Sequence, residues 1–194
     1  MKKLILMAVM AVLTLTASAQ VEKGMRYGVT FTGSMSKYSE LPDAGSMFGY
    51  GGGMALEYNF TPNVYIGTGL QFGLRGTKLK YYNVAGQSVP LDGALKSYNL
   101  FIPLHVGGRV NLSDNVSLFA QVGPYASFAA KKADMLILGY GTIEGENFDW
   151  GFDGKLGIEL FHFQVFGGYE FGMKEVWPGS AKNRSIVFGV GYMF

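Results

Sequence analysis

The 194-residue sequence predicts an all-β protein, an eight-stranded antiparallel up-and-down transmembrane β-barrel that follows an N-terminal signal peptide. Three observations predict this fold class. Apolar and polar residues alternate with a period of two in eight successive segments, the apolar face of these segments carries no charge, and the links between segments are alternately short and long. Together these observations favour strands that cross a lipid bilayer.

The N-terminus has the order of features found in secretory signal peptides. Lys2 and Lys3 precede an apolar run at 4–13, and small residues at 17–19 stand before Gln20. A helix that crosses a bilayer needs roughly 17–25 apolar residues, so this run is too short to be a membrane anchor. We therefore expect a cleaved signal peptide over residues 1–19 and one barrel domain over residues 20–194.

Composition excludes several classes of function. Loss of residues 1–19 removes two of the 16 basic residues and none of the 14 acidic residues, so the remaining chain is close to neutral and no nucleic-acid partner is expected. The chain has no cysteine, which excludes disulfides and a cysteine lipid anchor. Charged residues make up 15% of the chain and glycines number 29. Such a composition is typical of glycine- and aromatic-rich β-structure.

Eight segments show the alternation expected of barrel strands. In the second segment Tyr50, Met54, Leu56 and Tyr58 share one face, and the positions between them hold glycine, alanine and Glu57. Each segment alone is a weak signal, so the prediction depends on its recurrence. The expected strands cover residues 25–32, 48–60, 64–75, 99–112, 116–128, 148–160, 164–171 and 186–194.

The distribution of charge between the two faces decides between membrane and water. A charge that faces the middle of a bilayer costs roughly 2–4 kcal/mol, so a lipid environment explains an uncharged apolar face. A soluble lipocalin-like barrel is the alternative, but it would place the small, glycine-rich face outermost. The opposite, inward face is expected to hold nine charged residues: Arg26, Glu57, Arg75, Arg109, Asp149, Asp153, Lys155, Glu159 and Glu170.

The links give independent support for a barrel. Short links are expected at 61–63, at 113–115 and near His162, and the first two contain the turn formers Pro, Asn and Asp. Long links are expected at 35–47, 76–97, 129–147 and 174–184. Outer-membrane barrels have short periplasmic turns and longer extracellular loops, so both termini are expected in the periplasm. Outward aromatic residues near the strand ends are expected to form two interfacial girdles.

With the signal, the eight strands and the final segment Gly-Val-Gly-Tyr-Met-Phe in place, the chain resembles the small outer-membrane barrels of the OmpA/OmpX-like class. It looks most similar to the Bacteroidetes "porin family" barrel-domain proteins, in which Ala19-Gln20 is a familiar cleavage junction. The resemblance covers residues 21–194. It implies a location in the outer membrane of a Gram-negative bacterium, contact with outer-membrane lipid, and recognition of the last strand, with Phe194 as assembly signal, by the barrel assembly machinery.

The interior of an eight-stranded barrel is just wide enough for side chains to fill. The four inward cations and five inward anions nearly neutralise one another, and charges held away from water must be paired. We therefore expect a polar plug, with Arg75, Arg109 and Glu57 in one paired network. The alternative is a gate whose ion pairs exchange partners to open a narrow channel for small solutes.

Specificity is expected to reside in the outer loops, because loops on rigid scaffolds carry function. The apolar run Met135, Leu136, Ile137 and Leu138 falls in an expected outer loop. It either extends the neighbouring strands as a hairpin or contacts a partner. Trp177 is a second candidate contact. These features predict a non-enzymatic surface scaffold or binding protein with an extracellular partner.

An enzyme that modifies outer-membrane lipid is the remote alternative, because some eight-stranded barrels do so with histidine and serine or carboxylate side chains near the outer leaflet. Here His105 is expected to face inward in mid-strand and His162 to lie at a periplasmic turn, so neither stands beside a nucleophile. No metal-ligand spacing is present in the sequence. Neither a metal nor another cofactor is expected.

Overall fold

The computed structural model describes residues 23–39, 44–84, 87–131, 134–137, 141–177 and 181–194. Within these ranges no helix is long and apolar enough to cross a membrane. The expected signal peptide at 1–19 lies outside the described residues. The strands are β1 (Gly24–Tyr38), β2 (Ala44–Thr61), β3 (Val64–Val84), β4 (Gln87–Ser113), β5 (Val116–Lys131), β6 (Asp134–Ile137), β7 (Gly141–Glu144), β8 (Phe148–Leu160), β9 (Phe163–Trp177) and β10 (Ala181–Met193).

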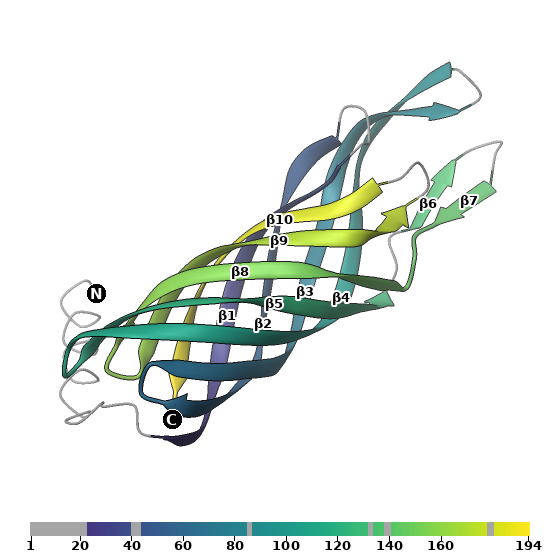
Figure 1. Cartoon of the computed structure of the whole chain (residues 1–194). Helices are drawn as coiled ribbons and strands as arrows, with labels where there is room; N and C mark the ends of the chain where they lie inside the picture. The colour runs from purple at the N-terminus through teal and green to yellow at the C-terminus, as the bar shows by residue number, and fades with distance from the viewer. Residues whose placement is uncertain (1–22, 40–43, 85–86, 132–133, 138–140, 178–180) are drawn as a thin grey trace, which may run out of the picture.

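Eight of these strands close into one antiparallel barrel, which confirms the predicted fold class. Their order around the barrel is β1, β10, β9, β8, β5, β4, β3 and β2, and β2 pairs with β1 to complete the circle. The remaining two strands, β6 and β7, form a separate hairpin in the connection from β5 to β8. Figure 1 shows an elongated barrel from which the β3–β4 and β6–β7 hairpins project at the same end.

The other end of the barrel, called the turn end below, carries the tight links and the end of β10 (Figure 1). Two-residue turns join β2 to β3, β4 to β5 and β8 to β9, which confirms the three predicted short links. At the first turn the Thr61 hydroxyl oxygen accepts hydrogen bonds from the backbone N–H groups of Asn63 and Val64. At the third turn Phe161 takes a left-handed conformation with φ of 58°, the conformation that a tight reversal requires.

At the opposite, hairpin end, the predicted long loops are wrong in extent, because strand pairing continues into all four. The largest difference is in β3 and β4, which remain paired from Gly76 opposite Lys96 to Val84 opposite Gln87. The apolar alternation that predicts a strand stops where the lipid stops. Backbone pairing does not depend on lipid, so two strands can continue as a hairpin in water without apolar alternation in their sequence.

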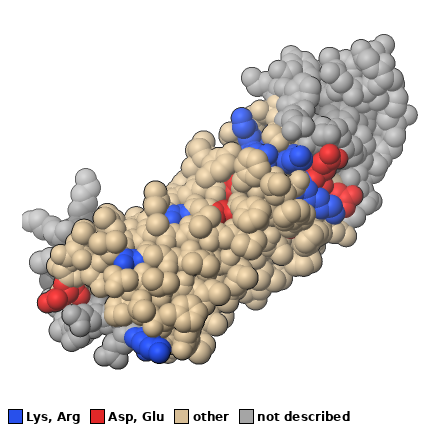
Figure 2. Space-filling model, viewed as in Figure 1, with Lys and Arg blue, Asp and Glu red and all other residues tan. Residues whose placement is uncertain are grey.

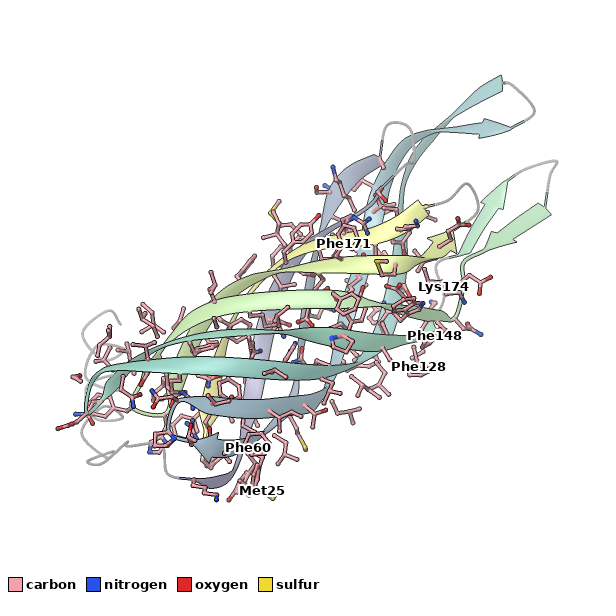
Figure 3. All side chains as sticks on the ribbon, in the orientation of Figure 1. Met25, Phe60, Phe128, Phe148, Phe171 and Lys174 are labelled. Carbon is pink, nitrogen blue, oxygen red and sulfur yellow. The ribbon has the colours of Figure 1, made fainter. Side chains whose placement is uncertain are left out.

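The outer face of the barrel is apolar, as the alternation predicts. Met54 and Leu156 are each 70% exposed, and both point away from the interior into the space that lipid occupies. Figure 3 shows Met25 and Phe60 near the turn end and Phe128, Phe148 and Phe171 near the hairpin end. Pairs such as Tyr58 with Phe60, and Phe128 with Phe148, have ring centroids 5.1 Å apart. These aromatic groups lie near the two ends of the barrel, and their role as girdles at the bilayer interfaces stays a prediction.

Three aromatic side chains inside the barrel each lie over a glycine on the neighbouring strand. Tyr65 lies directly opposite Gly107, and its ring occupies the place that a Cβ of this glycine would take. Phe119 covers Gly157 and Phe166 covers Gly189 in the same way, again between paired residues. At these three positions the inward glycine leaves no open space, because an aromatic ring fills the place beside it.

Candidate functional site

Near the turn end, two arginines and two glutamates from four strands meet across the barrel interior. This four-charge plug consists of Arg26 on β1, Glu57 on β2, Arg109 on β4 and Glu159 on β8. Arg109 Nη2 lies 3.0 Å from Glu57 Oε2 and 3.3 Å from Glu159 Oε2. Arg26 Nη2 lies 2.7 Å from Glu159 Oε1, and Arg26 Nη1 lies 3.6 Å from Glu57 Oε2. The plug carries no net charge when all four groups are ionised.

Neutral side chains complete the surroundings of the plug. Arg109, which is only 2% exposed, donates from Nη1 to Asn59 Oδ1 at 3.1 Å. Its guanidinium carbon lies 4.8 Å from the centre of the Tyr65 ring, a cation–π distance. Gln164 donates to Glu159 Oε2 at 2.9 Å. The plug and these neutral side chains together link β1, β2, β3, β4, β8 and β9 near the turn end.

A second layer of charge lies on the hairpin side of the plug. His105 Nε2 lies 2.8 Å from Asp153 Oδ1, and Lys155 Nζ lies 3.3 Å from Asp153 Oδ2. All three residues are buried. The Lys155 ammonium also lies within about 6 Å of the Phe101 and Phe166 rings, at 6.0 and 5.8 Å. This layer links β4 to β8 through the contact between His105 and Asp153, and the sequence indicated no partner for this histidine.

The third layer corrects the prediction that Arg75 shares one network with Arg109 and Glu57. Arg75 Nη2 instead lies 2.7 Å from Glu170 Oε1, and its guanidinium lies over Phe101 at 4.4 Å. The reason is depth: Arg75 lies ten residues along β3 from Tyr65, the residue that covers Arg109, which is roughly 30 Å of strand. Asp149 lies at this hairpin side too, and it accepts a hydrogen bond from the Tyr125 hydroxyl at 3.1 Å.

The nine inward charged residues thus occupy three successive layers and not one network. Alternation alone places all nine on the inner face, but it does not give their relative depth. The polar partners Asn59, Tyr65, His105 and Gln164 were missed as site residues. The same alternation could have identified these four residues, because each lies at an inward-facing position of its strand.

Small cavities separate the layers. One of about 40 Å³ touches the plug and is lined by Glu57, His105, Lys155 and Gln164, among others. Others of about 20 and 30 Å³ lie on either side of Arg75 toward the hairpin end. Spaces of this size hold one or a few water molecules. Buried oxygens such as Glu170 Oε2 and Asp149 Oδ1, which have no partner among the described atoms, are suitable partners for such water.

The expected loop contacts are only partly within the described structure. Met135, Leu136 and Ile137 belong to β6, where they pair with residues 141–143 of β7. Leu138 lies outside the described residues. Trp177 is the last residue of β9 and pairs with Ala181. The antiparallel pairing of β6 with β7 therefore agrees with the expectation that this apolar run forms a hairpin. Contact of the run with a partner stays a prediction.

Phe194, the expected assembly signal, lies at the turn end on the outer face. Its backbone N–H donates to the Tyr27 carbonyl at 2.7 Å, and its ring stacks on Tyr27 with centroids 5.3 Å apart. A T-shaped contact with Tyr192 places the two ring centres 4.9 Å apart. Phe194 thus joins β10 to β1 at the closure of the barrel. Its recognition by an assembly machinery stays a prediction.

The two histidines lie apart, His105 in the lumen and His162 in the β8–β9 turn. In the described part of the chain, no three His, Cys, Asp or Glu residues are arranged to hold a metal ion. The interior of the described barrel therefore offers paired charges that link strands to one another.

Comparisons with known proteins agree with this architecture. The family described as "Outer membrane protein beta-barrel domain" matches residues 5–194. The crystal structure of OprG from Pseudomonas aeruginosa is similar, with a TM-score of 0.56 and 14% identity over 90% of this chain and 98% of that one. Neisserial surface protein A has a TM-score of 0.54 and 11% identity over 89% of this chain and 98% of that one. The curated proteins give no match.

Proposed function

Since the chain belongs to the outer membrane protein beta-barrel domain family, we propose that it is a non-enzymatic surface scaffold that binds an extracellular partner through its projecting hairpins. Barrels in this membrane have short turns in the periplasm and long connections outside. We therefore place the turn end in the periplasm. The β3–β4 and β6–β7 hairpins, which project together from the other end of the barrel in Figure 1, then extend from the cell surface.

The observation that carries this proposal is the length of β3 and β4. A strand needs about 9–11 residues to cross the bilayer, whereas β3 has 21 residues and β4 has 27. Their surplus forms a two-stranded ribbon outside the lipid. Among the described residues, β3 beyond Leu79 and β4 before Tyr98 pair only with each other, which leaves backbone groups along the outer edges of this part of the ribbon. Such edges accept a further strand from another protein, because backbone hydrogen bonds supply affinity without a preformed pocket.

The contacts inside the barrel favour the scaffold function and not that of a diffusion pore. The four-charge plug lies across the interior near the turn end. The second layer adds a contact between the His105 imidazole on β4 and the Asp153 carboxylate on β8, and the third adds an ion pair between β3 and β9. Positions of both histidines away from the outer surface support a non-enzymatic role, because a lipid-modifying enzyme requires its catalytic groups near the outer leaflet.

A shortened hairpin tests the proposal. Residues 79–93 are replaced by an Asn-Gly turn that joins Lys78 to Ala94, which already lie opposite each other. We expect the variant to fold in lipid vesicles as well as the wild type, because the removed residues lie beyond the lipid-crossing strands. Capture of an extracellular partner, measured with proteoliposomes that display the hairpins outward, is expected to be lost.

A matched variant keeps the ribbon and replaces residues 135–138 with Ser and Gly, which tests the β6 segment separately. Loss of capture in this variant alone would move the contact from the β3–β4 ribbon to β6. Equal capture by the wild type and both variants, or no capture by the wild type above empty vesicles, would overturn the proposal. Loss of folding would show that the changed segment is part of the core structure.

A narrow gated channel is the second candidate, and the row of small interior cavities favours it. The cavity of about 40 Å³ ends at the plug, so exchange of partners among Arg26, Glu57, Arg109 and Glu159 would connect the cavities to the turn end. The measurement that separates the two functions is the conductance of the refolded protein in a planar bilayer.

A further inference from the structure

A polar recess lies at the hairpin end of the lumen, on the outer side of the ion pair between Arg75 and Glu170. It is the cavity of about 30 Å³ described above, and residues of seven barrel strands line it. Glu146 and Asn147 also line it and are exposed to solvent, so this mouth recess is open to water at the hairpin end. Its other lining residues include Tyr38, Ser97, Asn99, Ser127, Asp149 and Asn183.

Two buried side chains of the mouth recess each leave one polar atom unsatisfied. Asp149 is 8% exposed and Asn183 is 4% exposed. Asp149 Oδ1 and Asn183 Nδ2 have no hydrogen-bond partner among the described atoms. The second oxygen of the Asp149 carboxylate accepts a hydrogen bond from the Tyr125 hydroxyl at 3.1 Å. The amide oxygen of Asn183 accepts one from the Ser185 hydroxyl at 3.4 Å. These contacts hold both side chains in place, with one unsatisfied acceptor and one unsatisfied donor in the same recess.

The combination of an acceptor with a donor identifies the class of ligand. A buried polar group without a partner is costly, so a molecule that satisfies both atoms is bound favourably. A hydroxyl group can do so, because it both donates and accepts hydrogen bonds. The Asp149 carboxylate would repel an anion, whereas the Arg75 guanidinium would repel a cation, which also could not accept from the Asn183 amide. Figure 2 shows basic and acidic side chains together at the hairpin end of the visible face, so the rim there does not present a single sign of charge.

The size of the mouth recess limits how much of the ligand enters. A space of about 30 Å³ admits a few polar atoms but not a whole sugar ring. One edge of a sugar can enter with its hydroxyl groups, while the rest of the molecule lies in the water beyond Glu146 and Asn147. Tyr38 and Val176 supply aromatic and apolar surface beside the polar groups, which is the usual composition of a site for a small molecule.

We propose that the mouth recess binds one edge of a neutral saccharide. A hydroxyl group of the sugar donates to Asp149 Oδ1 and accepts from Asn183 Nδ2, in a place that water can otherwise occupy. The site lies inside the barrel, whereas the partner proposed for the β3–β4 ribbon binds outside it. The two proposals are therefore independent of each other.

An exchange of the two side chains tests the site. Asp149→Asn turns the unsatisfied acceptor into a donor, and Asn183→Asp turns the unsatisfied donor into an acceptor, with little change in shape. The double variant with both changes restores one donor and one acceptor and keeps the net charge of the wild type. Two control variants, Asp114→Asn and Asn111→Asp, make the same chemical changes at exposed positions of the turn end.

Each barrel is refolded in a phosphocholine detergent, which has no sugar headgroup, and titrated with the methyl glycosides of glucose, galactose, mannose and N-acetylglucosamine. Saturation-transfer NMR measures affinity, and the electrophoretic shift of the folded barrel checks folding. We expect the wild type and both controls to bind at least one glycoside. Each single site variant is expected to bind it roughly tenfold more weakly, the effect of one hydrogen bond to a charged or buried group. The double variant is expected to recover most of this loss.

A trisaccharide that ends in the bound sugar separates two sources of the ligand. Affinity at least equal to that of the methyl glycoside would assign the recess to the end of a glycan chain. Weaker binding of the trisaccharide would assign it to a free sugar. Both results support a saccharide ligand.

Three results would overturn the proposal. The first is no saturable binding of any glycoside by the wild type, and the second is equal affinity in the wild type and a folded single site variant. The third is competition of Ca²⁺ with the sugar in the wild type, which would show a cation site. Either single variant suffices if the other does not fold, and a folded double variant that does not regain affinity would contradict the bridging hydroxyl.

The barrel shortened at residues 79–93 separates this proposal from that of the ribbon. It retains every residue that lines the mouth recess, so it is expected to bind the glycoside as tightly as the wild type. Loss of sugar binding in this folded variant would place the sugar on the ribbon and overturn the recess as the site.

Discussion

Replacement of Arg109 by methionine is expected to lower the free energy of unfolding by about 3–5 kcal/mol, the usual cost of breaking a buried ion pair on one side. Arg109 is 2% exposed and contacts both Glu57 and Glu159. The variant leaves two buried carboxylates with Arg26 as the one remaining cation of the plug. Urea unfolding in lipid vesicles, followed by the electrophoretic shift of the folded barrel, measures the change.

Two comparisons show whether the loss comes from the plug. Lys96→Met removes an exposed cation from the same strand and is expected to change stability by no more than about 0.5 kcal/mol. Glu57→Gln combined with Arg109→Met is expected to cost less than the sum of the two single changes, because the partners interact directly. An unchanged urea midpoint for Arg109→Met would contradict a packed ionic plug.

Substitution of Gly107 by valine is expected to destabilise the barrel by about 1–3 kcal/mol or more. Any Cβ at this position occupies the place of the Tyr65 ring, so the ring must move. Movement of Tyr65 also removes the aromatic face that lies 4.8 Å from the Arg109 guanidinium carbon. The same urea titration measures the loss.

The adjacent glycine supplies a matched control. Gly108 points outward, and the nearest atom to a Cβ there is the Asn63 carbonyl oxygen at 3.9 Å. Gly108→Val is therefore expected to be neutral or slightly stabilising, since valine favours strand geometry. Equal losses at both positions would mean that glycine is needed for the backbone of β4 and not for the packing of Tyr65.

The period of two in the sequence predicts most of the barrel, because lipid demands an uncharged outer face over the whole membrane-crossing part of each strand. The same demand ends at the lipid surface. For that reason the sequence places Gly76 and Lys96 in a loop, although they are paired residues in a continuing hairpin. Proline, asparagine and aspartate mark two of the three tight turns, which are therefore predicted well.

The interior is predicted less completely, because alternation fixes which face a side chain occupies but not its depth. Arg75, Arg109 and Glu57 all lie at inward-facing positions. Because of the stagger between β3 and β4, however, Arg75 lies nearer the hairpin end than Arg109, and it pairs with Glu170. Pairing of His105 with Asp153 depends in the same way on the register of β4, β5 and β8. These registers follow from the closed barrel as a whole, so a single strand does not reveal them.

The central claim is that the protein acts through its outer hairpins and has an interior closed by paired charge. Conductance of the refolded wild-type barrel in a planar lipid bilayer tests it most directly. The account predicts no steady ion current across the bilayer at neutral pH, because the four-charge plug obstructs the lumen. A large and long-lived conductance of the wild-type protein would contradict the account and establish a pore.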